Sequence, residues 1–121
     1  MPNTLPDLVP CEAPATHNTD CLDAAKDTWN AANAAADAVF DAAHQAAWDA
    51  FNVSFERFEL LTKPEGQSEA EWQATLTVIL GGMEAERSVL ISLAMDAKTT
   101  AYGAANSAWT AETSLCCEGN A

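Results

Sequence analysis

The sequence predicts an all-α fold: a long antiparallel helical hairpin, with helices at residues 19–61 and 68–115, preceded by an extended N-terminal arm at residues 1–18. Three observations support this prediction. Polar residues recur at helical spacing in the first segment, one short turn separates the two segments, and prolines are concentrated in the arm. We expect the arm and the hairpin, residues 19–121, to form a single domain.

The arm contains four of the five prolines and shows no apolar periodicity, so it is expected to be extended. Its prolines and polar residues would make it a poor cover for the full length of a long helix. Any apolar surface that the two helices leave bare therefore needs another partner.

The first helix is expected to begin at Thr19 or Asp20, because both residue types are favoured N-caps. Its polar residues recur in steps of three and four and form one edge: Asp20, Asp23, Asp27, Asn30, Asp37, Asp41, Gln45, Asp49, Asn52, Glu56 and Glu59. One flank is a ridge of alanines: Ala24, Ala31, Ala35, Ala38, Ala42, Ala46 and Ala50. The other flank and the back carry aromatic residues, namely Trp29, Phe40, Trp48, Phe51, Phe55 and Phe58. One partner helix cannot cover both flanks, so we expect the aromatic residues to mediate self-association in a multi-chain bundle or filament.

The turn at residues 62–67 has local signals for a reversal of the chain. Pro64 disfavours helix at the preceding residue, and Gly66 tolerates a left-handed backbone. Ser68 and Glu71 then have the spacing of a capping box, which opens the second helix.

In the second helix, bulky apolar residues fill the first half and alanines recur in the second half. Antiparallel pairing about the turn places Gly81 and Gly82 level with Trp48. Two interpretations fit these glycines: they make room for the indole, or they mark a kink.

The charge of the chain excludes some partners. Eighteen acidic residues oppose five basic ones, which gives a formal net charge of −13. Such a chain repels phosphate backbones and anionic lipid, so nucleic acid is not expected as a partner. Glu84, Glu86 and Arg87 interrupt the most hydrophobic region, so no membrane span is predicted. The acidic edge is a candidate surface for divalent cations.

Four cysteines lie near the two ends of the chain, at Cys11, Cys21, Cys116 and Cys117. A hairpin brings these segments together, so we predict two intramolecular disulfides, with Cys21–Cys116 as the preferred pairing and Cys11–Cys117 as the other. Disulfides indicate an extracellular or cell-surface location. The N-terminal sequence shows no signal peptide, so we expect that a leader has been removed, although reduced thiols are the alternative.

One group of residues has the chemistry of a metal site. Asp41 and His44 lie three apart on the first helix, and Glu86 is expected at their level on the apolar face of the second. The Glu-x-x-His pairs of di-iron bundles are missing, so no metal or cofactor is assigned. A zinc site of four cysteines is also disfavoured, because Cys116 and Cys117 are adjacent and no C-x-x-C occurs.

These features favour a non-enzymatic structural protein, a disulfide-stapled hairpin that forms a homo-oligomer or filament. We keep two alternatives: a carboxylate and histidine metal-binding bundle with ferritin-like chemistry, and an amphipathic coat on a hydrophobic granule or lipid surface. No catalytic residues are predicted, because no triad or phosphate-binding loop is present.

Overall fold

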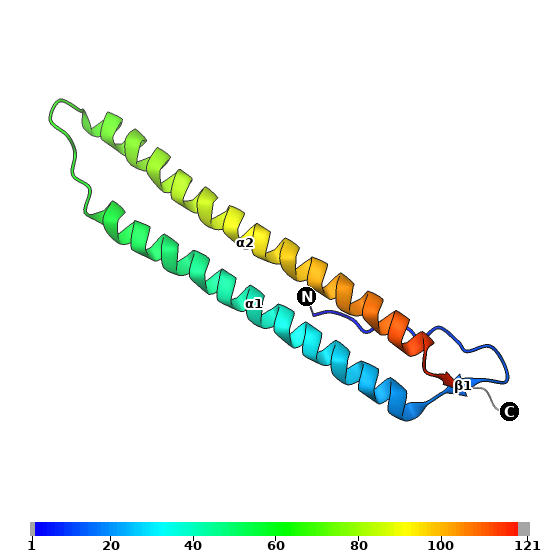
Figure 1. Ribbon diagram of the computed structural model, residues 1–121. Coiled ribbons are helices and arrows are strands. Elements are labelled where there is room, and N and C mark those ends of the chain that lie inside the picture. The colour runs from blue at the N-terminus through cyan, green and yellow to red at the C-terminus, as the bar shows by residue number, and fades with distance from the viewer. Residues whose placement is uncertain (1, 119–121) are drawn as a thin grey trace. The chain divides into compact units, whose positions relative to one another are not determined.

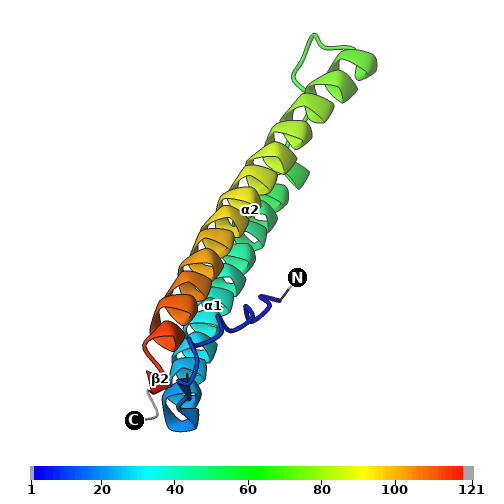
Figure 2. The same ribbon diagram turned by 90° about the vertical axis from the view of Figure 1, so that its right-hand side faces the viewer.

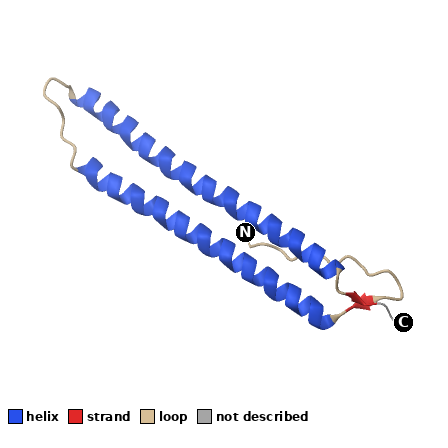
Figure 3. Ribbon diagram, viewed as in Figure 1, coloured by secondary structure: helices blue, strands red, loops and turns tan. Residues whose placement is uncertain are grey.

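Two long helices and one two-residue ladder account for the regular structure (Figure 1). The computed structural model describes residues 2–118. In chain order the elements are β1 (Thr16–His17), α1 (Thr19–Glu59), α2 (Glu69–Ser114) and β2 (Cys117–Glu118). Both helices end within two residues of the predicted positions, so the predicted all-α hairpin is confirmed (Figure 3).

The chain divides into two compact units. The stapled unit comprises residues 2–39 and 96–118 of the described chain, and the turn unit comprises residues 40–95. In each unit, a segment of α1 lies antiparallel to a segment of α2. The two units are described separately below.

The turn unit begins α2 with the predicted capping box. The backbone N–H of Glu71 donates to Ser68 Oγ at 3.1 Å, and the Ser68 N–H donates to Glu71 Oε1 at 3.0 Å. These bonds satisfy donors that a helix start otherwise leaves unpaired. The hydrogen bond that the Ser68 backbone N–H donates to the Glu71 carboxylate is the main cause that lowers the pKa of Glu71, and the Ser68 side chain lowers it further. Gly66 has the predicted left-handed backbone, with φ of 91°.

The start of α1 differs from the prediction in its capping residue. Asn18 is the N-cap, because its Oδ1 accepts the Cys21 N–H at 2.9 Å. The same side chain donates through Nδ2 to Glu118 at 2.6 Å, and the Asn18 N–H donates to the Cys116 carbonyl at 2.8 Å. These bonds sit beside the ladder in which His17 pairs with Cys117. Asn18 therefore ties the helix start to the C-terminal segment, a role that propensity alone does not reveal.

In the stapled unit the arm is part of the packing. It returns along one side of both helices (Figures 1 and 2). Asn3 Nδ2 donates to Asn33 Oδ1 on α1 at 2.7 Å and to Asn106 Oδ1 on α2 at 2.9 Å. The Trp109 indole N–H donates to the Pro6 carbonyl at 3.0 Å. The arm therefore covers part of the two helices in this unit, because its polar groups find partners on both of them.

The buried residues of the described chain are distributed unevenly between the units. Those of the stapled unit are Ala25, Asn33, Ala36, Ala105, Trp109, Thr113 and Cys116. In the described turn unit the only buried residue is Ala47. Two helices without a third layer leave much of their apolar surface open to solvent.

In the turn unit, Arg87 occupies a position in the helix–helix contact. Its guanidinium carbon lies 4.2 Å from the Trp48 ring centroid and 4.4 Å from that of Phe51. Arg87, and not Gly81 or Gly82, is thus level with Trp48. Nothing lies within 4 Å of a Cβ built on either glycine, so the prediction that these glycines make room for the indole is wrong. Symmetric pairing about the turn would place each residue of α2 beside a particular residue of α1. The observed pairing is shifted from that register by more than one helical turn.

None of the described helices is long and apolar enough to cross a membrane.

Candidate functional site

Helix α2 carries an exposed apolar surface in the turn unit. Residues recur there in steps of four and three, the spacing of one face of a helix. We call this face the outer stripe; it consists of Val78, Gly82, Ala85, Val89 and Leu93, all of which are exposed. The exposed fractions are 75% for Val78, 58% for Val89 and 59% for Leu93. Ile79 and Leu90, which lie beside the stripe, are also exposed.

The outer stripe has the composition of a helix-packing surface. It contains no charged residue, although the chain carries a net charge of −13. Gly82 and Ala85 have the smallest side chains of the stripe, and nothing lies within 4 Å of a Cβ built on Gly82. Small residues allow a second backbone to approach closely, while flanking valine and leucine side chains supply apolar contact.

The aromatic residues that the sequence singles out are more protected than predicted. Each of Trp29, Phe40, Trp48, Phe51, Phe55 and Phe58 is half-buried within its own chain. In the turn unit their rings contact one another: the Phe51 and Phe55 centroids lie 6.0 Å apart, and those of Phe55 and Phe58 5.7 Å apart. The Trp29 indole donates to Asn106 Oδ1 at 2.9 Å in the stapled unit. The aromatic side of α1 therefore faces α2 in part, and the more exposed apolar surface lies on α2.

The alanine ridge and the acidic edge of α1 face solvent. Every ridge alanine is exposed, so this flank does not form the contact with α2. The polar residues of the predicted edge are exposed as expected, with the exception of Asp37, which is half-buried.

Asp37 belongs to a polar cluster in the stapled unit. It accepts a short hydrogen bond from the Tyr102 hydroxyl and lies 3.4 Å from Lys98 Nζ. The bond from Tyr102 is the main cause that lowers the pKa of Asp37, and the same bond raises the pKa of Tyr102. The Lys98 ammonium also lies 5.3 Å from the Tyr102 ring centroid. This cluster links α1 to α2.

The metal candidates from the sequence do not converge on one point. Asp41 and Glu86 are exposed, and His44 is half-buried with its ring 5.7 Å from that of Phe40. Glu86 does not lie on the buried face of α2, where Arg87 stands instead. Within residues 2–118 the group that has metal-ligand spacing is a different one, namely Cys11, His17 and Cys117.

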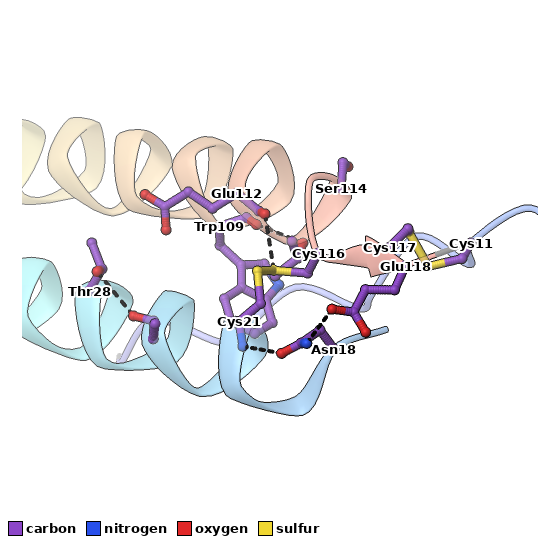
Figure 4. Close-up of a disulfide and its surroundings, with 12 residues drawn as sticks. Cys11, Asn18, Cys21, Thr28, Trp109, Glu112, Ser114, Cys116, Cys117 and Glu118 are labelled. Atoms are coloured by element: carbon purple, nitrogen blue, oxygen red, sulfur yellow. Dashed lines mark hydrogen bonds between the residues drawn. A yellow bond between two sulfur atoms is a disulfide. The ribbon is translucent and has the colours of Figure 1, made fainter. Parts of the chain in front are cut away.

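The four cysteines form the two predicted disulfides. Cys21 pairs with Cys116 and Cys11 with Cys117, with Cα–Cα distances of 5.5 and 5.7 Å (Figure 4). Cys116 is almost completely buried, and so is Thr113, whose carbonyl accepts the Cys116 N–H at 3.0 Å. Cys11 and Cys117 are half-buried and line a hollow of about 320 Å³ with Val9, Pro10, Glu12, Ala15 and Ser114.

Neither family models, nor curated proteins, nor solved structures match this chain. The structure offers two features with chemical or binding potential: the outer stripe of α2, and the part of the stapled unit that holds both disulfides, residues 11–21 and 116–118, which we call the stapled end.

Proposed function

We propose that the protein is a non-enzymatic structural subunit, a disulfide-stapled helical hairpin that associates with further copies of itself through the outer stripe of α2. The observation that carries this proposal is the uneven burial of the described residues. The stapled unit has seven buried residues, and the turn unit has one. Association would supply the layer that the turn unit lacks.

A second copy is the partner whose chemistry best fits the outer stripe. The stripe is uncharged and apolar, so its partner must present an apolar surface of similar shape. Two such stripes are complementary in a twofold dimer, because each Val and Leu can pack beside the small residues of the other copy. Nucleic acid and anionic lipid are disfavoured by the net charge of −13.

The aromatic residues of α1 supply a second surface in this proposal. Their exposed edges would join dimers into a larger oligomer or filament, and divalent cations would bridge acidic edges of neighbouring copies. The two disulfides support an oxidising setting, and we place the assembly outside the cell or at its surface.

Replacement of Val89 by Glu tests the proposal. This side chain lies in the middle of the outer stripe and is mostly exposed, so a glutamate should leave the folded chain stable. In an assembly it would bury an unpaired charge, and we expect the association constant to fall by about tenfold or more. Light scattering coupled to gel filtration measures the mass at matched concentrations.

The matched control is Val39→Glu, which changes a valine on α1, outside the stripe, that is 66% exposed against 58% for Val89. We expect it to associate like the wild type. If Val39→Glu dissociates the oligomer while Val89→Glu does not, the interface lies on α1 and the assignment to α2 is wrong. A monomeric wild type that adsorbs to neutral oil droplets through the stripe would instead favour the coat-protein alternative.

Phe51→Asp, which the sequence suggests as a test, is a poorer probe. Phe51 is half-buried and contacts Arg87 within the chain. A charge at this position would disturb the hairpin itself, so loss of assembly would not identify an interface.

A further inference from the structure

The stapled end brings a histidine next to the more exposed disulfide. His17 faces Cys117 across the β1–β2 ladder, and Cys11 reaches the same point from the arm. The potential ligand atoms of Cys11, His17 and Cys117 all lie within 4.8 Å of one another. Two sulfurs and one imidazole nitrogen form a donor set that Zn²⁺ prefers.

An independent observation concerns the histidine itself. His17 Nε2 is a buried atom and has no hydrogen-bond partner in the structure. Buried polar nitrogens are nearly always paired, and a disulfide sulfur is a poor partner for one. The oxidised state therefore leaves this buried nitrogen without a hydrogen-bond partner.

The two disulfides differ in their access to solvent. Cys116 is 2% exposed, which shields its sulfur from an attacking thiolate, whereas its partner Cys21 is half-buried. Cys11 and Cys117 are half-buried and line the hollow of about 320 Å³ described above. Because both of its cysteines line this hollow and neither is fully buried, we expect a small dithiol to reduce Cys11–Cys117 before Cys21–Cys116.

From these observations we infer that Cys11–Cys117 is the oxidised form of a metal site, in which the two cysteine thiolates and His17 Nε2 bind one Zn²⁺-like ion after reduction. A dithiol donates two electrons, becomes a cyclic disulfide and leaves two thiols on the protein. Metal binding releases the two thiol protons, while the imidazole binds in its neutral form. The resulting centre, one divalent ion with two thiolates, carries no net charge, and water fills the fourth position.

The rest of the stapled end would hold the ligands in place during this exchange. Cys21–Cys116 remains closed, and Asn18 still bonds to the Cys116 carbonyl and to Glu118. The metal would then replace the covalent link between the arm and the C-terminal segment. The arm would stay attached in both redox states, although by a bond that a chelator can remove.

Cobalt(II) is the probe for this site, because thiolate ligands in tetrahedral geometry give it intense charge-transfer and visible bands. The full-length protein is reduced with limiting dithiothreitol, the reagent is removed without air, and mass spectrometry after thiol labelling verifies that Cys11 and Cys117 alone are free. Cobalt is then titrated into the oxidised and the reduced protein. We expect no tetrahedral bands in the oxidised form and one bound ion per chain in the reduced form.

His17→Ala identifies the imidazole ligand, and His44→Ala is the matched control on α1. We expect the dissociation constant for cobalt to rise at least tenfold in His17→Ala and to stay unchanged in His44→Ala, with circular dichroism showing that both variants retain their helices. Equal affinities for His17→Ala and the wild type would overturn the assignment of His17. Absence of tetrahedral bands in the reduced wild type would overturn the site altogether.

Discussion

At the scale of single residues, polar side chains determine how the arm docks in the stapled unit. Asn3 bonds to Asn33 and Asn106 on different helices, and Asn106 also accepts from the Trp29 indole. An unmade hydrogen bond at a buried group costs about 1–3 kcal/mol, so Asn3→Ala should lower the free energy of unfolding by roughly that amount. Urea denaturation measures the loss, with Thr4→Ala, an exposed neighbour, as the control. Equal stability of the two variants would show that the arm contributes nothing through Asn3.

The bond between Tyr102 and Asp37 gives a prediction about pH. It lowers the pKa of Asp37 below 3.8, so the stabilisation is present above that pH and is lost as the carboxylate protonates in acid. It raises the pKa of Tyr102 above 10.0, so the stabilisation is present below that pH and is lost as the phenol ionises in base. The difference in unfolding free energy between wild type and Tyr102→Phe should thus be largest between these values. A difference that is constant from pH 3 to pH 11 would contradict this account.

At the scale of elements, local signals predicted most of the fold. The polar edge of α1, the turn with Gly66 and the capping box of Ser68 and Glu71 need only neighbouring residues, and all three are present. The register of α2 was not predictable in this way, because it depends on how Arg87 packs against Trp48 and Phe51. That shift explains why the expected position of Glu86 on the buried face was wrong.

The stapled end shows the same limit of sequence reasoning. Cysteine positions at the two ends of a hairpin were sufficient for the pairing of both disulfides. The proximity of His17 to Cys11 and Cys117 depends on a two-residue ladder. Such a short ladder has no alternating apolar pattern from which it could be predicted. The bulky apolar residues in the first half of α2 did not reveal the outer stripe, because which face of the helix stays exposed depends on how α2 packs against α1.

The two disulfides should stabilise the fold in a non-additive way. Either bond alone closes a loop of about 100 residues, which contributes ~4.7 kcal/mol in the chain-entropy model. Once one is closed, the other closes only a loop of about a dozen residues and adds roughly 3 kcal/mol.

Cys11→Ala with Cys117→Ala should thus lower the unfolding free energy by ~3 kcal/mol, and removal of both bonds by more than twice that value. Denaturation of the two paired variants and the cysteine-free chain checks this; losses that simply add would contradict the shared-loop argument.

At the scale of the whole molecule, apolar exposure and negative charge oppose each other. The outer stripe favours association, whereas a net charge of −13 on each copy resists it. Salt shortens the Debye length from about 30 Å at 0.01 M to about 8 Å at 0.15 M and so weakens the repulsion without removing the apolar contact. Association should therefore strengthen as ionic strength rises, and calcium should act at lower concentrations than sodium.

Sedimentation equilibrium of the unmodified, oxidised protein tests self-association most directly. A chain of 12.8 kDa is measured over a hundredfold range of concentration at low and at physiological salt. We predict masses of at least two chains that increase with concentration, with tighter association at the higher salt. A single species of 12.8 kDa under all of these conditions would contradict the proposal that the outer stripe of α2 is an interface between copies of this chain.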